Sequence, residues 1–274
     1  MKLDIRDVQY EVNIAGAGAG EPLLLIHGFS GSQRQWQPFI ERWASRYQLI
    51  LLDMLGHGGT SAPEQAERYS TQQTVKDIEQ VLEHFRIESA HVLGYSMGGR
   101  IALSFAMLAG GKACSLILES SSPGLASEEE RAARRASDDA LAARIEQQGI
   151  AWFAEYWGSL PLFASLQKLP AAARQQLHEA RLGNNPFGLA QSLRGIGTGQ
   201  QPSWWEQLHQ LTIPVQLIAG RLDSKYCDIA QAMQQRLPCA ELELVSEAGH
   251  NVHMEQPQLF DTIVMRFLDQ IRKV

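Results

Sequence analysis

Short apolar runs alternate along the chain with stretches of helical periodicity. Six runs of three or four residues are apolar at most or all positions: residues 23–26, 49–52, 91–93, 116–118, 215–218 and 242–245. Strands have this pattern when helices cover both faces of their sheet. Helical patterns place apolar residues on one face of residues 71–85 and at every fourth position of 259–271. The alternation predicts an α/β protein with a parallel sheet, and the period-two pattern of residues 3–14 predicts an antiparallel pair at its edge.

One long region interrupts this alternation. Residues 123–207 contain no convincing strand and are rich in Ala, Arg, Glu and Gln. Helical patterns within it cover residues 128–135, 151–156, 171–182 and 188–193, and prolines separate them. A structureless connection of roughly 85 residues is far longer than loops in compact domains usually are. We therefore predict a helical cap, or lid, at 123–207, inserted into a core formed by residues 1–122 and 208–274.

The charge balance excludes two classes of partner. The chain has 24 Lys and Arg against 30 Asp and Glu, which gives a formal net charge of −6. A sequence-independent nucleic-acid binder presents a basic surface, and so does a protein that is held electrostatically on anionic membranes. We therefore expect neither nucleic acid nor membrane as a partner. Basic side chains placed locally would have to hold an anionic ligand, because the protein as a whole repels it.

The cysteines and the N-terminal segment indicate a compartment. Cys114, Cys227 and Cys239 form no Cys-x-x-Cys pair, which suits a reducing environment and excludes a disulfide framework or a cysteine-rich zinc site. The first residues alternate charged and apolar side chains and lack the apolar core of a secretory signal. The apolar runs are too short to span a bilayer. We therefore expect a cytoplasmic protein.

Ser96 lies in a Gly-x-Ser-x-Gly motif between an apolar run and a helical pattern. Gly94 and Gly98 flank it, and glycines there allow a sharp, strained turn that lifts the serine side chain above the end of a strand. The motif in this setting is typical of a catalytic serine. The same turn directs the backbone amide of Met97 toward a developing oxyanion. We expect a second donor from the loop after an earlier strand, where the amide of Phe29 follows a His-Gly pair.

A serine of this kind needs a histidine base that a carboxylate orients. The expected chain order is serine, acid, histidine. Asp223 and His250 each follow a predicted strand, so both emerge at the edge of the sheet where Ser96 lies. His253 is the competing base, and Glu119, at the end of another predicted strand, is the competing acid.

Together these pieces resemble the α/β-hydrolase superfamily over the whole chain. The resemblance rests on the His27-Gly28 loop, the Asp53-x-x-Gly56-x-Gly58 turn, the Gly94-Tyr95-Ser96-Met97-Gly98 elbow, Asp223 and His250. It implies the α/β-hydrolase fold, a mostly parallel twisted sheet flanked by helices, with Ser96, Asp223 and His250 as the catalytic triad. It does not select a reaction, because this scaffold hosts many chemistries.

Smaller motifs narrow the reaction. In chain order they are Gly28-Phe29-Ser30-Gly31-Ser32, Arg100, Ser122-Pro123-Gly124-Leu125 with the basic segment 129–135, Trp157 before Pro161, Arg181 before Asn184-Asn185, and Arg221-Leu222-Asp223-Ser224-Lys225-Tyr226. This set resembles the 2-succinyl-6-hydroxy-2,4-cyclohexadiene-1-carboxylate (SHCHC) synthases of menaquinone biosynthesis. The resemblance implies a lyase that uses the triad, without cofactor or metal. Such a lyase eliminates pyruvate from SEPHCHC, a small cyclohexene that carries several carboxylates and an enolpyruvyl ether.

A polycarboxylate substrate calls for basic side chains near Ser96. Arginine can meet a carboxylate with two parallel hydrogen bonds. Arg100 lies four residues after Ser96, one helical turn away and on the same face of the predicted helix. The other substrate-binding candidates are Arg134 (with Arg131 and Arg135 as alternatives of register), Arg181, Lys225, Tyr95 and Trp157.

Two other hypotheses use the same residues differently. A hydrolase of carboxylic esters or carbon–carbon bonds would need the same triad, with Ser96 as nucleophile, so the triad alone leaves this alternative open. A non-catalytic receptor built on this fold is disfavoured by the intact set of Ser96, Asp223 and His250.

Overall fold

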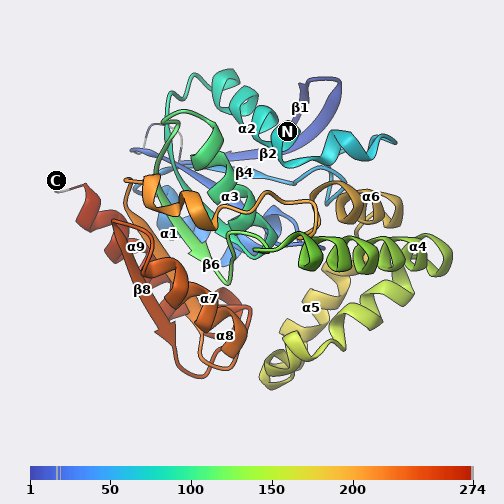
Figure 1. Ribbon diagram of the computed structural model, residues 1–274. Coiled ribbons are helices and arrows are strands. Elements are labelled where there is room, and N and C mark those ends of the chain that lie inside the picture. Colours follow the sequence, from blue (N-terminus) through green and yellow to red (C-terminus); the bar gives the residue numbers. More distant parts are fainter. Residues whose placement is uncertain (17, 19, 273–274) are drawn as a thin grey trace.

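An eight-stranded sheet forms the centre of the protein (Figure 1). The computed structural model describes residues 1–16, 18 and 20–272. The strands are β1 (Lys2–Ile5), β2 (Val8–Ala15), β3 (Pro22–Ile26), β4 (Gln48–Leu52), β5 (Ala90–Tyr95), β6 (Ala113–Glu119), β7 (Val215–Gly220) and β8 (Ala240–Val245). Their order is β1-β2-β4-β3-β5-β6-β7-β8. The pairs from β4 to β8 are parallel, while β1 pairs with β2 and β2 with β4 antiparallel. The α/β class and the antiparallel edge pair are therefore confirmed.

Helices cover both faces of this sheet. On one face, α2 (Thr71–His84), α3 (Met97–Leu108) and α7 (Ser224–Gln234) contribute to the larger core cluster. On the other, α1 (Gln37–Ala44) and α9 (Pro257–Ile271) contribute to a second cluster. The remaining short elements of the core are η1 (Gln33–Trp36), η2 (Ala66–Tyr69) and α8 (Val252–Glu255). This two-sided cover explains why the central strands are apolar at almost every position.

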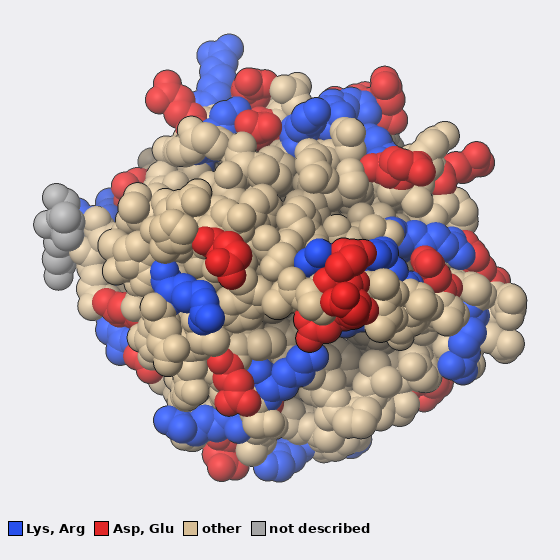
Figure 2. Space-filling model, viewed as in Figure 1, with Lys and Arg blue, Asp and Glu red and all other residues tan. Residues whose placement is uncertain are grey.

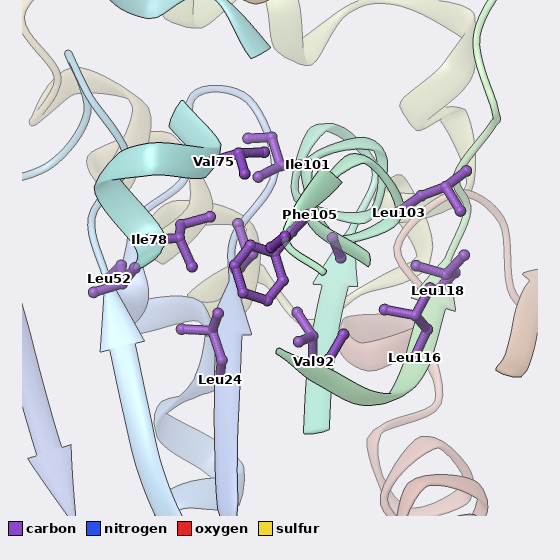
Figure 3. Close-up of a cluster of buried hydrophobic side chains, with 14 of the residues drawn as sticks. Leu24, Leu52, Val75, Ile78, Val92, Ile101, Leu103, Phe105, Leu116 and Leu118 are labelled. Atoms are coloured by element: carbon purple, nitrogen blue, oxygen red, sulfur yellow. The ribbon is translucent and has the colours of Figure 1, made fainter. Parts of the chain in front are cut away.

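Figure 3 shows how the larger core cluster is built around α3. Phe105 of α3 points toward Leu24 of β3 and Val92 of β5, and Ile78 of α2 lies beside them. All four side chains are at most 1% exposed. Burial of such a side chain contributes about 1.5–3 kcal/mol, so this packing fixes α3 on the sheet. It also fixes Ser96, which directly precedes α3.

A helical insertion separates β6 from β7. It contains α4 (Glu128–Gly158), η3 (Pro161–Lys168), α5 (Ala171–Leu182) and α6 (Pro186–Ile196), and η4 (Trp205–Gln210) follows it. The predicted helix at 171–182 coincides with α5. The chain is back on the core by Trp204, because Trp204 packs against the larger core cluster and Leu208 belongs to it.

The first helical stretch of the insertion extends beyond residues 128–135, whose pattern predicts it. Ser127 and Glu130 form a capping box that starts α4, with the Glu130 amide donating to the Ser127 hydroxyl at 3.1 Å. Gly149, at φ 78° and ψ 179°, is not helical and divides α4 into two helices, and the separate helices predicted at 128–135 and 151–156 lie on either side of it. A small apolar cluster then joins the second half to α6 through Phe153 and Leu189.

The surface carries charges of both signs. On the face shown in Figure 2, Lys and Arg side chains are intermixed with Asp and Glu, and no extended basic patch covers it. No helix in the described part of the chain is both long and apolar enough to cross a membrane.

Candidate active site

Ser96 occupies a strained turn between β5 and α3. Its backbone has φ 52° and ψ −109°, a conformation that costs a residue with a side chain about 1–3 kcal/mol. The turn is possible because Gly94 and Gly98 pack backbone against backbone: a Cβ on Gly94 would meet the carbonyl of Gly98, and one on Gly98 the carbonyl of Ile26. The Ser96 amide donates to the carbonyl of Glu119 at 2.8 Å, which fixes the turn on β6.

Three side chains from different strand ends meet above the sheet. The Ser96 hydroxyl lies 2.9 Å from Nε2 of His250, and Nδ1 of His250 lies 2.8 Å from Oδ2 of Asp223. His250 is 2% exposed and Asp223 9%. Nδ1–H donates to the carboxylate, so Nε2 is free to accept the serine proton, as a general base requires. The structure thus brings together the three residues that the sequence analysis predicted as a triad.

The competing acid and base pair with each other instead. Nδ1 of His253 lies 2.8 and 2.9 Å from the two carboxylate oxygens of Glu119. Glu119 is 0% exposed and His253 2%. Because each is satisfied by the other, neither replaces Asp223 or His250 in the triad.

The loop after β3, which carries Phe29, is held by the buried ring of His27. Nδ1–H of His27 donates to the carbonyl of Gly28 at 2.7 Å, while Nε2 accepts from the amide of Met54 at 2.9 Å. Burial lowers the pKa of His27 to about 4, so the ring is neutral and can accept in this way. Within the described residues, neither the Phe29 amide nor the Met97 amide donates a hydrogen bond to a protein group. Both are free to bind a developing oxyanion.

Arg100 is a buried cation beside Ser96 and α6. Its Nη1 donates to the carbonyl of Ile196 at 3.0 Å and to Oε1 of Gln201 at 2.9 Å. No described carboxylate lies within ion-pair distance of it, and it is only 9% exposed. Burial lowers its pKa to about 10, so it remains charged at neutral pH. A buried guanidinium held by neutral groups attracts an anionic ligand.

Of the three arginines in the basic segment of α4, Arg134 is the one that acts electrostatically on Arg100. Arg131 and Arg135 both form ion pairs with the exposed carboxylate of Glu128. Arg134 instead pairs with the buried Asp138, with Nε donating to Oδ1 at 2.8 Å. Burial lowers the pKa of Arg100, Tyr226 and Asp138 oppose this shift, and the charge of Arg134 adds to it, so Arg134 and Asp138 both lie within electrostatic range of Arg100.

Arg181 and Trp157 approach the site from the insertion. The Arg181 guanidinium lies 5.6 Å from the ring of Phe163, which is itself 6.0 Å from the ring of His250. Burial lowers the pKa of Arg181. The Trp157 ring lies edge-on to that of Phe29 at 5.2 Å.

A cavity lies within the insertion, and none of its lining residues belongs to the triad. It measures about 240 Å³, lies between α4, η3 and α5, and includes Arg181 in its lining. Gly158 leaves room for the side chain of Arg181, because a Cβ at this position would lie 2.7 Å from Nη1 of Arg181.

Two other predicted substrate-binding residues have different surroundings. The Tyr95 hydroxyl donates to Oδ1 of Asn251 at 2.7 Å, and Tyr95 is 6% exposed, so it is buried in protein contacts. Lys225 is exposed, with Nζ 5.9 Å from the ring of Tyr226. Neighbours in sequence need not point in the same direction.

Tyr226 takes the position that Lys225 was expected to hold. Its ring lies edge-on to His250 at 4.6 Å. Burial raises the pKa of its hydroxyl, and the charges of Arg100 and Arg134 oppose that rise, so it stands within reach of both arginines. One feature of the sequence could have identified Tyr226 as a site residue: it lies three residues after Asp223, in the first turn of α7.

A comparison with known proteins decides the family. A family model for the alpha/beta hydrolase fold matches residues 21–257. The chain belongs to the α/β-hydrolase family.

Two curated relatives carry the same synthase name. A 2-succinyl-6-hydroxy-2,4-cyclohexadiene-1-carboxylate synthase from Salmonella paratyphi C (strain RKS4594) is 34% identical over 245 residues, 89% of this chain and 92% of that protein. A Bacillus subtilis (strain 168) protein that carries the same synthase name provisionally is 42% identical over 264 residues, 96% of each chain. The solved structure of MenH from S. aureus matches with a TM-score of 0.91 at 34% identity, covering 95% of this chain and 98% of that one. Within the α/β-hydrolases, the chain therefore belongs to the family of these synthases.

Proposed function

We propose that this protein is an SHCHC synthase, which eliminates pyruvate from SEPHCHC in menaquinone biosynthesis. The observation that carries the proposal is Arg100, a buried cation one helical turn from Ser96 that forms no direct ion pair with a described carboxylate. A substrate with several carboxylates explains such a charge, whereas an apolar ester does not. The full-length relatives named as SHCHC synthases support the same conclusion.

Ser96 acts as a base in this reaction. His250, oriented by Asp223, takes the hydroxyl proton, and Ser96 Oγ removes a ring proton α to the succinyl carbonyl of the substrate. The amides of Phe29 and Met97 stabilise the negative charge that develops on that carbonyl oxygen. The electron pair then expels pyruvate as its enolate, which takes up a proton. No covalent bond between enzyme and substrate is required.

Basic groups around the triad hold the substrate. Arg100 and Arg134 would bind one carboxylate from the side of α3 and α4, and Arg181 would bind another from α5. Each charge-assisted hydrogen bond contributes about 1.5–3 kcal/mol. Trp157, beside Phe29, would close the pocket over the ring. We also propose that the enzyme works in the cytoplasm on this small polycarboxylate, since its three cysteines are unpaired.

Pyruvate release tests the proposal directly. Purified protein is incubated with SEPHCHC, and pyruvate is followed continuously beside a p-nitrophenyl ester as the hydrolase control. We expect rapid pyruvate release with little ester hydrolysis, and a loss of about 10²–10⁴-fold in Ser96→Ala, the usual contribution of a general base. Efficient ester turnover without pyruvate formation would show that the protein is a hydrolase and not this synthase.

A further inference from the structure

Two buried contacts outside the triad connect the elbow of Ser96 to the turn that carries His250. Tyr95 directly precedes Ser96, and its hydroxyl donates to Oδ1 of Asn251, the residue after His250, at 2.7 Å. The carboxylate of Glu119 accepts from both the amide and Nδ1 of His253, at 3.0 and 2.8 Å.

The two strand residues that make these contacts are neighbours in the sheet. Tyr95 and Glu119 are register partners at the ends of the parallel strands β5 and β6. The Tyr95 ring packs against the rings of both His250 and His253, at 5.5 and 4.8 Å between centroids. Tyr95, Glu119 and His253 are all at most 6% exposed, so water does not compete strongly for these hydrogen bonds.

Glu119 acts on both partners of the reactive pair. Its carbonyl accepts from the amide of Ser96 at 2.8 Å, while its carboxylate holds the turn of residues 250–253. The other carboxylate on this turn, Glu255, accepts from the amides of Gly249 and Asn251 and belongs to the same local segment, so it cannot fix the turn relative to Ser96.

We propose that Glu119 is a positioning residue: through its carbonyl and its carboxylate, with Tyr95 as a second tie, it sets the distance between Ser96 Oγ and His250 Nε2. A misplacement of about 1 Å between reacting groups can cost about 10²-fold in rate. Neither Glu119 nor Tyr95 touches the substrate in this role. The inference requires the triad to be the reactive centre, whichever reaction it performs.

The reactivity of Ser96 tests this without SEPHCHC. A fluorophosphonate labels the serine: Oγ forms a bond to phosphorus, fluoride leaves and the hydroxyl proton passes to His250. In Glu119→Ala we expect the labelling rate to fall at least 10-fold. Glu119→Gln should recover most of it, because its amide oxygen still accepts from His253. For pyruvate release, kcat should fall in parallel while KM changes less than about 3-fold. This second readout alone rests on the proposed function.

Asp77 provides the matched control for a loss of stability. It is a carboxylate 1% exposed that binds the hydroxyl of Tyr10 and the guanidinium of Arg68, away from the triad. Asp77→Asn should lower the melting temperature but leave the labelling rate unchanged. If Glu119→Ala does not fold, Tyr95→Phe carries the test: it should slow labelling by several-fold, and adding Glu119→Gln should slow it by more than the product of the two single effects. A folded Glu119→Ala variant that loses no more reactivity than Asp77→Asn, or a Tyr95→Phe variant that labels at the parental rate, would overturn the proposal.

Discussion

Arg100 donates from Nη1 to the side-chain carbonyl of Gln201 at 2.9 Å, so a buried guanidinium beside the catalytic serine is held by a neutral amide. Gln201 is 2% exposed and comes from the far end of the insertion. A carboxylate in its place would neutralise the arginine permanently. The neutral partner orients the cation and leaves its charge for a ligand.

Gln201→Glu should therefore inhibit the enzyme. The new carboxylate would pair with Arg100 and compete with the substrate, so we expect kcat/KM for pyruvate release to fall about 10–100-fold, the equivalent of one lost charge-assisted hydrogen bond. Most of the effect should appear in KM. Gln201→Ala, which loses the tether but keeps the free charge, should lose less. Equal losses in the two variants would show that orientation of Arg100, and not its charge, is what Gln201 provides.

The three arginines on α4 should differ in their effect on catalysis. Arg134→Ala should lower kcat/KM for SEPHCHC by about 10-fold, because this guanidinium lies near Arg100. Arg135→Ala should leave it within about 2-fold, since Arg135 pairs with Glu128 and donates to the carbonyl of Gly199 at 3.0 Å. Steady-state kinetics of both variants, checked for equal melting temperature, make the comparison. A larger effect in Arg135→Ala than in Arg134→Ala would show that Arg135, and not Arg134, serves the substrate.

Much of this site could be predicted because local rules govern it. The elbow needs glycines on both sides of Ser96, and chain order then identifies Asp223 and His250 at neighbouring strand ends. The strands were predictable for a similar reason, since burial on both faces leaves continuous apolar runs.

Side-chain direction could not be predicted by the same rules. Tyr95 and Lys225 adjoin catalytic positions in sequence, yet Tyr95 bonds to Asn251 and Lys225 is exposed. Gly149 gives no sign in the helical pattern that it bends α4, because glycine is tolerated in helices as well as in turns. The tertiary contacts that decide these directions join segments far apart in the chain.

Gly28 should resist substitution for a specific steric reason. A Cβ there would lie 2.6 Å from two carbons of the Tyr95 ring, which cannot yield easily because its hydroxyl is tied to Asn251. Gly28→Ala should therefore displace the loop and move the Phe29 amide away from the oxyanion. We expect kcat to fall at least about 10-fold, toward the loss seen when an oxyanion donor is removed. Steady-state pyruvate release from SEPHCHC measures this loss. A folded Gly28→Ala variant with the parental kcat would show that the clash with Tyr95 does not displace the loop.

The protein should lose stability in mild acid through two buried histidines. Burial lowers the pKa of His27 to about 4 and of His57 to about 3, so both are neutral in the folded state. In the unfolded state each takes up a proton near pH 6.5. Stability is thus complete above pH 6.5 and falls below it, by about 1.4 kcal/mol per pH unit for each histidine, until the folded pKa is reached. Urea unfolding between pH 7.5 and 5 measures this slope. His57→Asn should remove the contribution of His57 to this slope, and an unchanged slope in that variant would contradict the assignment.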